Sequence, residues 1–546
     1  ASTRDQGYLY LDSAGTSSAI YFARYSPKIV YYSIGSSGDK KTGSPSITIS
    51  SGTATLGAAQ TGNVGVGDKI TFSGGTQSEV YISAVNSQTS FDVILVDGST
   101  PVNDSGTVTT ITRTFNDIGT AISNAGGASY LNSYNLATSL TKLYLVCYKD
   151  AAFSEAVQID GYTTNADYFL TLTVAGASQV AGGTSQRHSG TEGTGAVVQP
   201  PSGANYGVSV EDAYTVVEWL EVDGSNVTVT SSDGVQVEVA GSANVTVQNL
   251  IIHDWLLAND GGIYADQDNL TVLNTIIYDT TCSMELTGNN GTIQNSTIYN
   301  GSNCGLLIYT GTGYTVENVV SMGNIGGNDF SCSGSVSTFN NNMSEDTSAG
   351  SYGGSGNLDS QTTADQFVSI SGSIDLHLKA GADAIDAGKD LSGSFTDDID
   401  GGTRSGTWDI GADEYASGGN QTPDDPTITD HNDGSTISDN TPTLGITQSD
   451  PDTSEQVKYR IQIDDTDNTF SSLVVDYTSA LMAEGAASFT VGQAAGSGTY
   501  TVGSESQTLA DGDYFWRVMT TDDESAASGW TQATAGTIIA FTLNTD

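Results

Sequence analysis

Few side chains in this sequence combine the types and spacing that acid–base chemistry requires. His253 directly precedes Asp254 at the end of a strand-like run, where the imidazole could act as a general base. Arg187 and His188 form the only adjacent pair of a basic residue and a histidine, within the polar loop GGTSQRHSGTEG. His253 has no cationic partner, and such a histidine is more often a turn or surface residue, whereas His188 has Arg187 beside it.

Carboxylates could also carry out chemistry, because glycoside hydrolysis needs two of them beside the scissile bond. The repeated part of the chain offers four candidates, Asp260, Asp266, Asp268 and Asp279. Asp and Glu together number 63, however, so close pairs arise by chance. The sequence alone does not select one pair.

The elements that must position these residues are six copies of one short pattern between Tyr214 and Thr347. Each copy has Thr, an apolar residue, any residue, Asn and then a second apolar run. Glu218 takes the Asn place in the first copy. In the other five copies the spacings of the Asn are 25, 21, 23 and 23 residues, and the positions are Asn249, Asn274, Asn295, Asn318 and Asn341. A fixed period of this size indicates stacked repeats.

The content of each period predicts the kind of stack. Apolar and polar residues alternate as in strands, and Gly, Asn, Asp and Ser separate the strands. No period has room for a helix of ordinary length, so we predict an all-β right-handed parallel β-helix with coils about 4.8 Å apart. The five asparagines should form a structural ladder at a turn, since Asn tolerates the left-handed conformation. Each amide could then bond to the coils above and below.

Two cysteines follow the same period. Cys282 and Cys304 are 22 residues apart, and each lies just before the second strand of its copy. Adjacent coils would bring their Cα atoms within disulfide range. Two small buried side chains would fit the same pattern, so a disulfide and two free thiols both stay open.

Changes of pattern along the chain of 546 residues divide it into five regions. We expect a capping helix with Thr114 as its N-cap, because apolar residues recur at helical spacing from Phe115 to Ala125. The predicted regions are N-terminal strands with the start of the β-helix (1–45), an inserted small β-barrel (46–112), the capping helix and β-helix (113–415), a linker (416–421) and a β-sandwich (422–546).

Charge excludes some partners. The chain has 16 basic and 63 acidic residues, a net charge of −47, and such a surface repels nucleic acid and anionic membranes. No apolar run is long enough to span a membrane. Residue 1 is Ala and lysines are few, so we expect an extracellular or cell-surface location after removal of a signal peptide.

Acidic loops invite a calcium interpretation. For the loop near Arg404, the alternative is that Arg404 pairs with the carboxylates. For the acidic runs near Asp450 and Asp464, the alternative is that the loops are simply solvated. We expect no cofactor other than calcium. The weak candidates are Asp397, Asp398, Asp400, Asp450, Asp452, Asp464 and Asp465.

Several of these motifs together resemble a known family. The start (YYSIGSSG and TFNDIGTAISNA), the Asn-bearing coils and the ending (AIDAG, DIDG, Arg404 and DIGADEY) resemble secreted bacterial right-handed β-helix proteins of the pectate-lyase-like superfamily. The resemblance covers roughly 26–45 and 111–415, and it implies that the DIGADEY segment closes the last coil. The run LADGDYFWRV resembles fibronectin type III and immunoglobulin-like modules of bacterial surface proteins.

The best-known members of that superfamily cleave uronate polymers, and the resemblance implies this activity only if the residues support it. A lyase of this type commonly uses Arg or Lys as its base, but no Lys or Arg lies between Arg187 and Lys379. The paired-Asp and Gly-His-Gly signatures of polygalacturonases are also missing. We therefore expect no cleavage of uronans, and the Arg187–His188 loop is the best remaining place for a site.

These observations favour a structural protein over an enzyme. We expect an extracellular structural or adhesive subunit that joins copies of itself head to tail through its end modules, as in a surface filament or fibre. Two alternatives stay open. One is a carbohydrate-active enzyme, a polysaccharide lyase or a glycoside hydrolase, and the other is a surface protein whose partners are cell-surface glycans. A phage tail-spike-like fibre is a more distant possibility.

Overall fold

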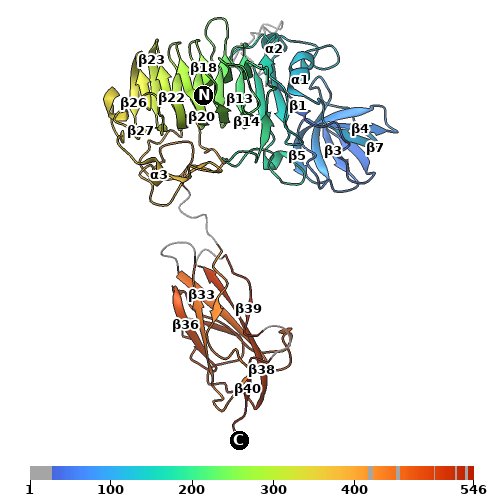
Figure 1. Cartoon of the computed structure of the whole chain (residues 1–546). Coiled ribbons are helices and arrows are strands. Elements are labelled where there is room, and N and C mark those ends of the chain that lie inside the picture. The colour runs from blue at the N-terminus through green and yellow to red at the C-terminus, as the bar shows by residue number, and fades with distance from the viewer. Residues whose placement is uncertain (1–26, 416–421, 451–455, 497, 523–525, 535–538) are drawn as a thin grey trace, which may run out of the picture. The chain divides into compact units, whose positions relative to one another are not determined.

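The computed structural model describes residues 27–415, 422–450, 456–496, 498–522, 526–534 and 539–546 (Figure 1). The chain divides into two compact units, residues 1–415 and 416–546. Three expectations fall outside the described residues: the strand-like runs before residue 27, the linker at 416–421 and the calcium candidate Asp452.

The first unit is a stack of parallel coils with three faces, which we call sheets A, B and C. Sheet A contains, in pairing order, β1 (Lys28–Ile34), β8 (Thr141–Cys147), β10 (Leu170–Val174), β13 (Val216–Glu218), β16 (Thr246–Gln248), β19 (Thr271–Leu273), β21 (Thr292–Gln294), β23 (Thr312–Glu317) and β26 (Ser335–Asn340). Sheet B contains β11 (Ala196–Val198), β14 (Leu220–Asp223), β17 (Ile251–Trp255), β24 (Val320–Met322) and β27 (Met343–Ser344). Sheet C contains β9 (Val157–Ile159), β12 (Tyr206–Val210), β15 (Asp233–Val237), β18 (Gly261–Ala265) and β25 (Phe330–Cys332).

Two long strands, β20 (Ile276–Leu286) and β22 (Thr297–Ile308), pass from sheet B into sheet C and join them. Each strand lies in register with the equivalent strand of the next coil, so inward apolar residues such as Val222, Ile252 and Ile277 form a continuous core. The predicted all-β stack of parallel coils is therefore confirmed.

The five ladder asparagines lie where sheet A turns into sheet B. Their φ angles fall between 43° and 56°, a left-handed conformation that Asn tolerates well. Trp219, with φ of 65°, occupies the equivalent place in the first copy, because Glu218 pairs with Gln248 and not with Asn249. The assignment of that place to Glu218 was wrong by one residue.

The ladder amides bond mainly outside the coils. Among the five asparagines, one side-chain amide bonds to another: Asn318 Nδ2 donates to Asn295 Oδ1 (3.0 Å). The other side-chain donors reach backbone carbonyls between residues 387 and 411, for example Asp397 for Asn274 (2.6 Å) and Ala387 for Asn341 (2.8 Å). The expected bonding between neighbouring coils is thus largely replaced by bonding to a covering segment.

That segment, residues 363–415, is called the strap here. It contains α3 (Thr363–Gln366), β28 (Phe367–Ser369) and β29 (Asp375–Leu378), and its apolar side chains pack on outward residues of sheet B such as Ile251 and Ile276. The expectation that DIGADEY closes the end of the stack is therefore wrong. Arg404 holds the strap instead, through Glu414 Oε2 (3.0 Å) and Asn274 Oδ1 (3.0 Å).

The N-terminal end of the stack is covered by α1 (Ile118–Ala125), whose Ile118, Ala121, Ile122 and Ala125 are buried against the first coils. Its N-cap is Asp117, which accepts from Thr120 N, and not Thr114 as predicted. Two short elements, α2 (Leu136–Ser139) and the 3₁₀ helix η1 (Ala177–Gln179), follow, and another, η2 (Ala349–Tyr352), lies near the other end. No helix among the described residues has the length and apolar composition of a membrane span.

The insertion between β1 and α1 is a closed six-stranded barrel, drawn in blue in Figure 1. Its strands are β2 (Ser46–Ser50), β3 (Thr53–Leu56), β4 (Lys69–Ser73), β5 (Glu79–Ser87), β6 (Ser90–Ile94) and β7 (Asp104–Thr112). Arg113 at its exit is buried and bonds to Asp68 (2.8 Å) and Asp150 (2.9 Å), which ties the barrel to the coils.

The second unit has two sheets around one core that includes Trp516, Tyr459 and Phe489. The smaller sheet contains β30 (Thr427–Ile428), β32 (Thr443–Gln448) and β36 (Gly485–Thr490). The larger contains β31 (Ser435–Ile437), β40 (Phe541–Leu543), β38 (Gly512–Asp522), β33 (Gln456–Asp464), β34 (Leu473–Thr478), β37 (Thr499–Val502), β35 (Met482–Ala483) and β39 (Thr531–Gln532). Its likeness to fibronectin type III or immunoglobulin-like modules stays a prediction.

Candidate functional site

The loop that carries Arg187 and His188 is folded against the coils. The Arg187 guanidinium lies over the Trp219 ring at 4.3 Å, and its Nε donates to the Val174 carbonyl (3.1 Å). His188 is buried, and its Nε2 donates to the Asn249 carbonyl (2.8 Å). Burial lowers the pKa of His188 to about 4, so the ring is neutral at pH 7. Both side chains hold the loop in place; His188 is buried, whereas Arg187 stays partly exposed over Trp219.

His253 is enclosed on the outer face of sheet B. Its Nδ1 bonds to Asp254 (3.0 Å), its Nε2 bonds to Glu221 (3.2 Å), and its ring stacks on Tyr278 with centroids 5.1 Å apart. Burial alone would lower the pKa of His253, but the hydrogen bonds to Asp254 and Glu221 outweigh it and raise the pKa to about 10. A cation at neutral pH cannot accept a proton, so His253 is a structural ion-pair partner and not a base.

The four carboxylates that the sequence offered lie apart. Asp279 accepts from Asn300 Nδ2 (2.5 Å), and Asp268 accepts from the backbone and side chain of Asn289 (both 2.8 Å), so each stabilises a turn. Asp266 is exposed at the end of β18. Only Asp260 faces a cavity.

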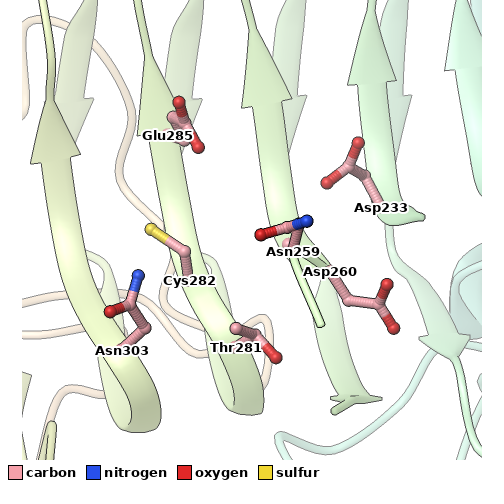
Figure 2. Close-up of a pocket in the computed structure, with 8 residues that line it drawn as sticks. Asp233, Asn259, Asp260, Thr281, Cys282, Glu285 and Asn303 are labelled. Atoms are coloured by element: carbon pink, nitrogen blue, oxygen red, sulfur yellow. The ribbon is translucent and has the colours of Figure 1, made fainter. Parts of the chain in front are cut away.

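That cavity is a pocket of about 90 Å³ on the outer face of sheet C, over β15, β18 and β20 (Figure 2). It contains three carboxyl side chains, from Asp233, Asp260 and Glu285. The full lining is Asp233, Asn259, Asp260, Gly261, Thr281, Cys282, Glu285 and Asn303. The sequence did not single out Asp233 or Glu285, since isolated acidic residues are common throughout the chain.

Strand register creates this pocket. Asp233 on β15 pairs with Gly261 on β18, and Gly261 pairs with Cys282 on β20. A Cβ at position 261 would lie only 2.5 Å from Asp233 Oδ1, so glycine leaves the space into which the carboxyl group points. Asp233 Oδ2 also accepts from Gln236 Nε2 (3.0 Å), which fixes its orientation.

Asp260 is held more firmly than Asp233. Its Oδ1 accepts from Ser232 N (3.0 Å), and its Oδ2 accepts from Leu257 N (2.9 Å). Two backbone donors therefore keep this carboxylate in a fixed position beside Asp233. Burial raises the pKa of Asp260 above its ordinary range, and these two donors oppose that rise.

The surroundings in this pocket change the pKa of Asp233. Burial raises its pKa to about 7, opposed by the Gln236 hydrogen bond and increased by the charges of Asp260 and Glu285. Near neutral pH this group is therefore a carboxylic acid for part of the time, with two further carboxyl groups in the same pocket. A proton donor and a proton acceptor in one cavity can carry out general acid–base chemistry.

An aromatic ring lies beside the pocket. Tyr264 projects from β18 in the outward row between Gln236 and Glu285, and it is partly exposed. Aromatic faces offer an apolar surface that sugar rings can cover, while their polar edges stay in water. The pocket and Tyr264 together present an acid, a carboxylate and a stacking surface.

The wall opposite Asp233 contains a disulfide. Cys282 and Cys304 lie side by side in adjacent coils, with Cα atoms 4.7 Å apart, and their sulfurs are bonded. Cys147 and Cys332 are free thiols. The bond joins β20 to β22 at the edge of the pocket, so it fixes the strands that carry Thr281, Glu285 and Asn303.

The calcium candidates of the strap point to different partners. Asp398 accepts from two backbone N–H groups of its own turn (2.7 and 3.0 Å), Asp397 faces Asn249 Nδ2 (3.4 Å), and Asp400 bonds to His377 Nε2 (2.9 Å). These three carboxylates therefore do not converge on one point.

In the second unit, Asp464 accepts three backbone N–H bonds of the following loop (2.7 to 3.1 Å), and Asp465 beside it is exposed. The N–H of Asp450 donates to Glu484 (3.2 Å). These contacts stabilise loops, and calcium binding at either place stays a prediction.

Comparison with known proteins identifies the fold of the region that carries the pocket. Residues 206–366 match a family described as right handed beta helix region. This stretch of the chain is a right-handed β-helix. The β-helix contains every residue that lines the pocket. Comparison with curated proteins gives no significant match.

Two solved structures are similar at low identity. The full-length tailspike protein 2 of Escherichia coli O157:H7 bacteriophage CAB120 matches at 10% identity and a TM-score of 0.20, covering 71% of this chain and 60% of that chain. The enzymatically active domain of tailspike protein 2 from bacteriophage CBA120 matches at 9% identity and a TM-score of 0.22, covering 76% of this chain and 74% of that one. The chain thus spans less than two thirds of the full-length tailspike. Similarity at this level carries no argument about function, which must be inferred from the pocket.

Proposed function

We propose that this protein binds a neutral polysaccharide across sheet C and hydrolyses a glycosidic bond in the pocket. The observation that carries the proposal is the pocket that brings together the carboxyl groups of Asp233, Asp260 and Glu285, and burial there raises the pKa of Asp233 to about 7. The sequence favoured a structural role, and this pocket moves the proposal to the carbohydrate-active alternative.

In the proposed reaction Asp233 donates its proton to the glycosidic oxygen as the bond between that oxygen and the anomeric carbon breaks. Water then bonds to the anomeric carbon, and a carboxylate takes the proton that the water loses. Glu285 suits this second role better than Asp260, because both oxygens of Asp260 already accept backbone N–H bonds. Proton return from Glu285 through solvent restores Asp233.

Charge selects the class of substrate. The pocket is lined by carboxyl groups, and the chain carries a net charge of −47. Uronates and sulfated sugars would be repelled, whereas a neutral sugar can donate its hydroxyl hydrogens to these carboxylates. The absence of Lys and Arg between Arg187 and Lys379 supports the same choice.

The test is release of reducing ends from a panel of neutral polysaccharides such as xylan, glucomannan, dextran and mixed-linkage glucan, using the full chain. We expect activity on at least one, and a loss of about 10²–10⁴-fold in Asp233→Asn, the usual contribution of a general acid. Asp266→Asn, at an exposed carboxylate outside the pocket, is the matched control. Failure of the wild type on the whole panel, or full activity of Asp233→Asn, would refute the proposal.

A second proposal concerns assembly and location. We propose that the protein acts outside the cell, where cell-surface glycans are its partners, and that copies can join head to tail. The disulfide supports an oxidising compartment. The first half of β26, at the end of sheet A, supports assembly, because Ser335 and Ser337 are exposed there and a strand edge can accept a neighbour, whereas the Phe339 carbonyl already accepts from Asn357 Nδ2 (3.2 Å). A monomer in ultracentrifugation and electron microscopy, in 0.15 M salt with and without calcium, would rule out the filament.

A further inference from the structure

His377 lies in a cluster of carboxyl groups that the proposed hydrolysis does not use. It projects from β29 of the strap, and its side chain is 20% exposed, so solvent reaches it. Nδ1 bonds to Asp375 Oδ1 (2.5 Å), and Nε2 faces Asp400 Oδ1 (2.9 Å). An oxygen of the buried Asp413 carboxyl group lies within 4.8 Å of a ring nitrogen of His377 and of an Asp400 oxygen, and Asp413 Oδ2 accepts from Leu378 N (2.7 Å).

We propose that His377, Asp400 and Asp413 bind one divalent transition-metal ion of the zinc class. One donor atom from each residue lies within 4.8 Å of the other two, so a single ion can contact all three after small side-chain movements. Imidazole nitrogen and carboxylate oxygen are ligands that zinc accepts, and three protein ligands leave the fourth position to water. This site is separate from the carboxyl pocket of sheet C and does not depend on the function proposed for it.

Asp375 gives the imidazole the orientation that metal binding requires. Its carboxylate holds the hydrogen on Nδ1 (2.5 Å), so Nε2 is the nitrogen that would bind the ion, which would take the place of the hydrogen in the Nε2–Asp400 bond (2.9 Å). A carboxylate on the far nitrogen of a ligating histidine is the usual arrangement at protein zinc sites, because it fixes the tautomer and makes the ligand more basic.

A second segment keeps space over the donor atoms. Gly190, from the loop of Arg187 and His188, has a φ of +73°. A Cβ at this position would lie 2.3 Å from His377 Nε2 and 2.8 Å from Asp400 Oδ1. Any other residue would push a side chain between these two ligands, so glycine keeps them free to approach an ion.

Charge also favours a cation. The carboxyl groups of Asp375, Asp400 and Asp413 face one imidazole, and the nearby Arg404 guanidinium is already paired with Glu414 Oε2 (3.0 Å). A divalent ion would neutralise the excess and would join three points of the strap, namely β29, the turn at Asp400 and the segment at Asp413. Its expected role is to fasten the strap over sheet B.

The comparable cluster at Asp223, His253 and Asp254 does not offer the same site. The side chain of His253 is only 4% exposed, whereas that of His377 is 20% exposed. Tyr278 further covers the ring by stacking on it. An ion would have to open that packing, whereas His377 and Asp400 already reach the surface.

The test uses the full chain, freed of metal by a chelator and then titrated with zinc chloride in a calorimeter. We expect about one equivalent of zinc per chain, since the cluster holds one ion. His377→Gln and Asp400→Asn should each weaken binding at least tenfold, and circular dichroism checks that both variants fold. His431→Gln, which removes an imidazole from the second unit, is the matched control and should bind like the wild type.

A second readout follows the strap itself. Zinc should slow amide hydrogen exchange in residues 375–413 of the wild type and leave exchange in His377→Gln unchanged. Two results would overturn the proposal. One is a wild type that binds no stoichiometric zinc, and the other is a His377→Gln variant that binds zinc as tightly as the wild type, which would indicate an adventitious ion only.

Discussion

Replacing Asp233 by asparagine should stabilise the β-helix at pH 8 while it removes the proposed activity. Asp233 is 9% exposed, and burial raises its pKa from 3.8 to about 7. This shift of about 3 pH units corresponds to about 4 kcal/mol at 1.36 kcal/mol per unit. Because the shift destabilises the ionised form, the folded protein is penalised when this group loses its proton.

The sign of the pH dependence follows from proton binding. Between pH 4 and pH 7 the folded state holds the Asp233 proton more tightly than the unfolded state, so the free energy of unfolding falls as pH rises through this window. Asparagine does not ionise and escapes the penalty. The variant should match the wild type near pH 4 and exceed it by up to about 4 kcal/mol above pH 7.

The assay is calorimetric unfolding of wild type and Asp233→Asn at several pH values, read as the difference between the two proteins. Differences are needed because Asp212, Asp409 and Asp413 also have pKa values raised by burial to about 6, and their effects cancel. Asp266→Asn should show no such trend, since its side chain is exposed. A stability difference that is constant from pH 4 to 8, or a less stable variant at pH 8, would refute the reasoning.

Three further variants test the interactions that hold the β-helix together. Arg404→Met should cost about 3–5 kcal/mol, because it leaves the partners of a buried cation unpaired, and proteolysis should then cut the strap first. His253→Gln should lower stability at pH 6 by about 3–5 kcal/mol. This loss should shrink as the pH of the comparison approaches 10, since the pKa of His253 is raised from 6.5 to about 10 and the stability that its proton supplies disappears over that range. Replacing Cys282 and Cys304 by serine should cost about 3 kcal/mol through loss of loop closure, measured as a lower midpoint in guanidinium.

The repeat period was enough to predict the coils, because every coil solves the same packing problem with the same residue types. Cys282 and Cys304 occupy matching places in adjacent coils, as their spacing indicated. The position of Glu218 was misjudged since a one-residue shift keeps the same apolar pattern, and only strand pairing shows that Trp219 stands at the turn.

The strap was harder to predict because it covers the coils from a distant part of the chain. The sequence did contain a signal: Ile251 and Ile252 are consecutive apolar residues in one strand, and Ile276 and Ile277 repeat this in the next coil. Strand geometry sends one of each pair outward, so an outer apolar layer was required. That layer is the strap, and it explains why the ladder asparagines bond outward.

The pocket could not be read from the sequence for a different reason. Asp233 belongs to no motif, and its chemistry comes from burial, from the glycine opposite it and from two carboxylates in other coils. His253 and the Arg187–His188 pair were more conspicuous, yet the structure uses them as packing and ion-pair residues. Residue type suggested the candidates, whereas environment decides their protonation.

The pH dependence of reducing-end release tests the central claim most directly. With the polysaccharide that the panel identifies, the rate at saturating substrate should fall above about pH 7 along a single-proton curve, because the acid must hold its proton to act. A rate that stays constant from pH 6 to 9 would contradict the assignment of Asp233 as the proton donor. Absence of release from every polysaccharide at every pH would contradict the hydrolytic function itself.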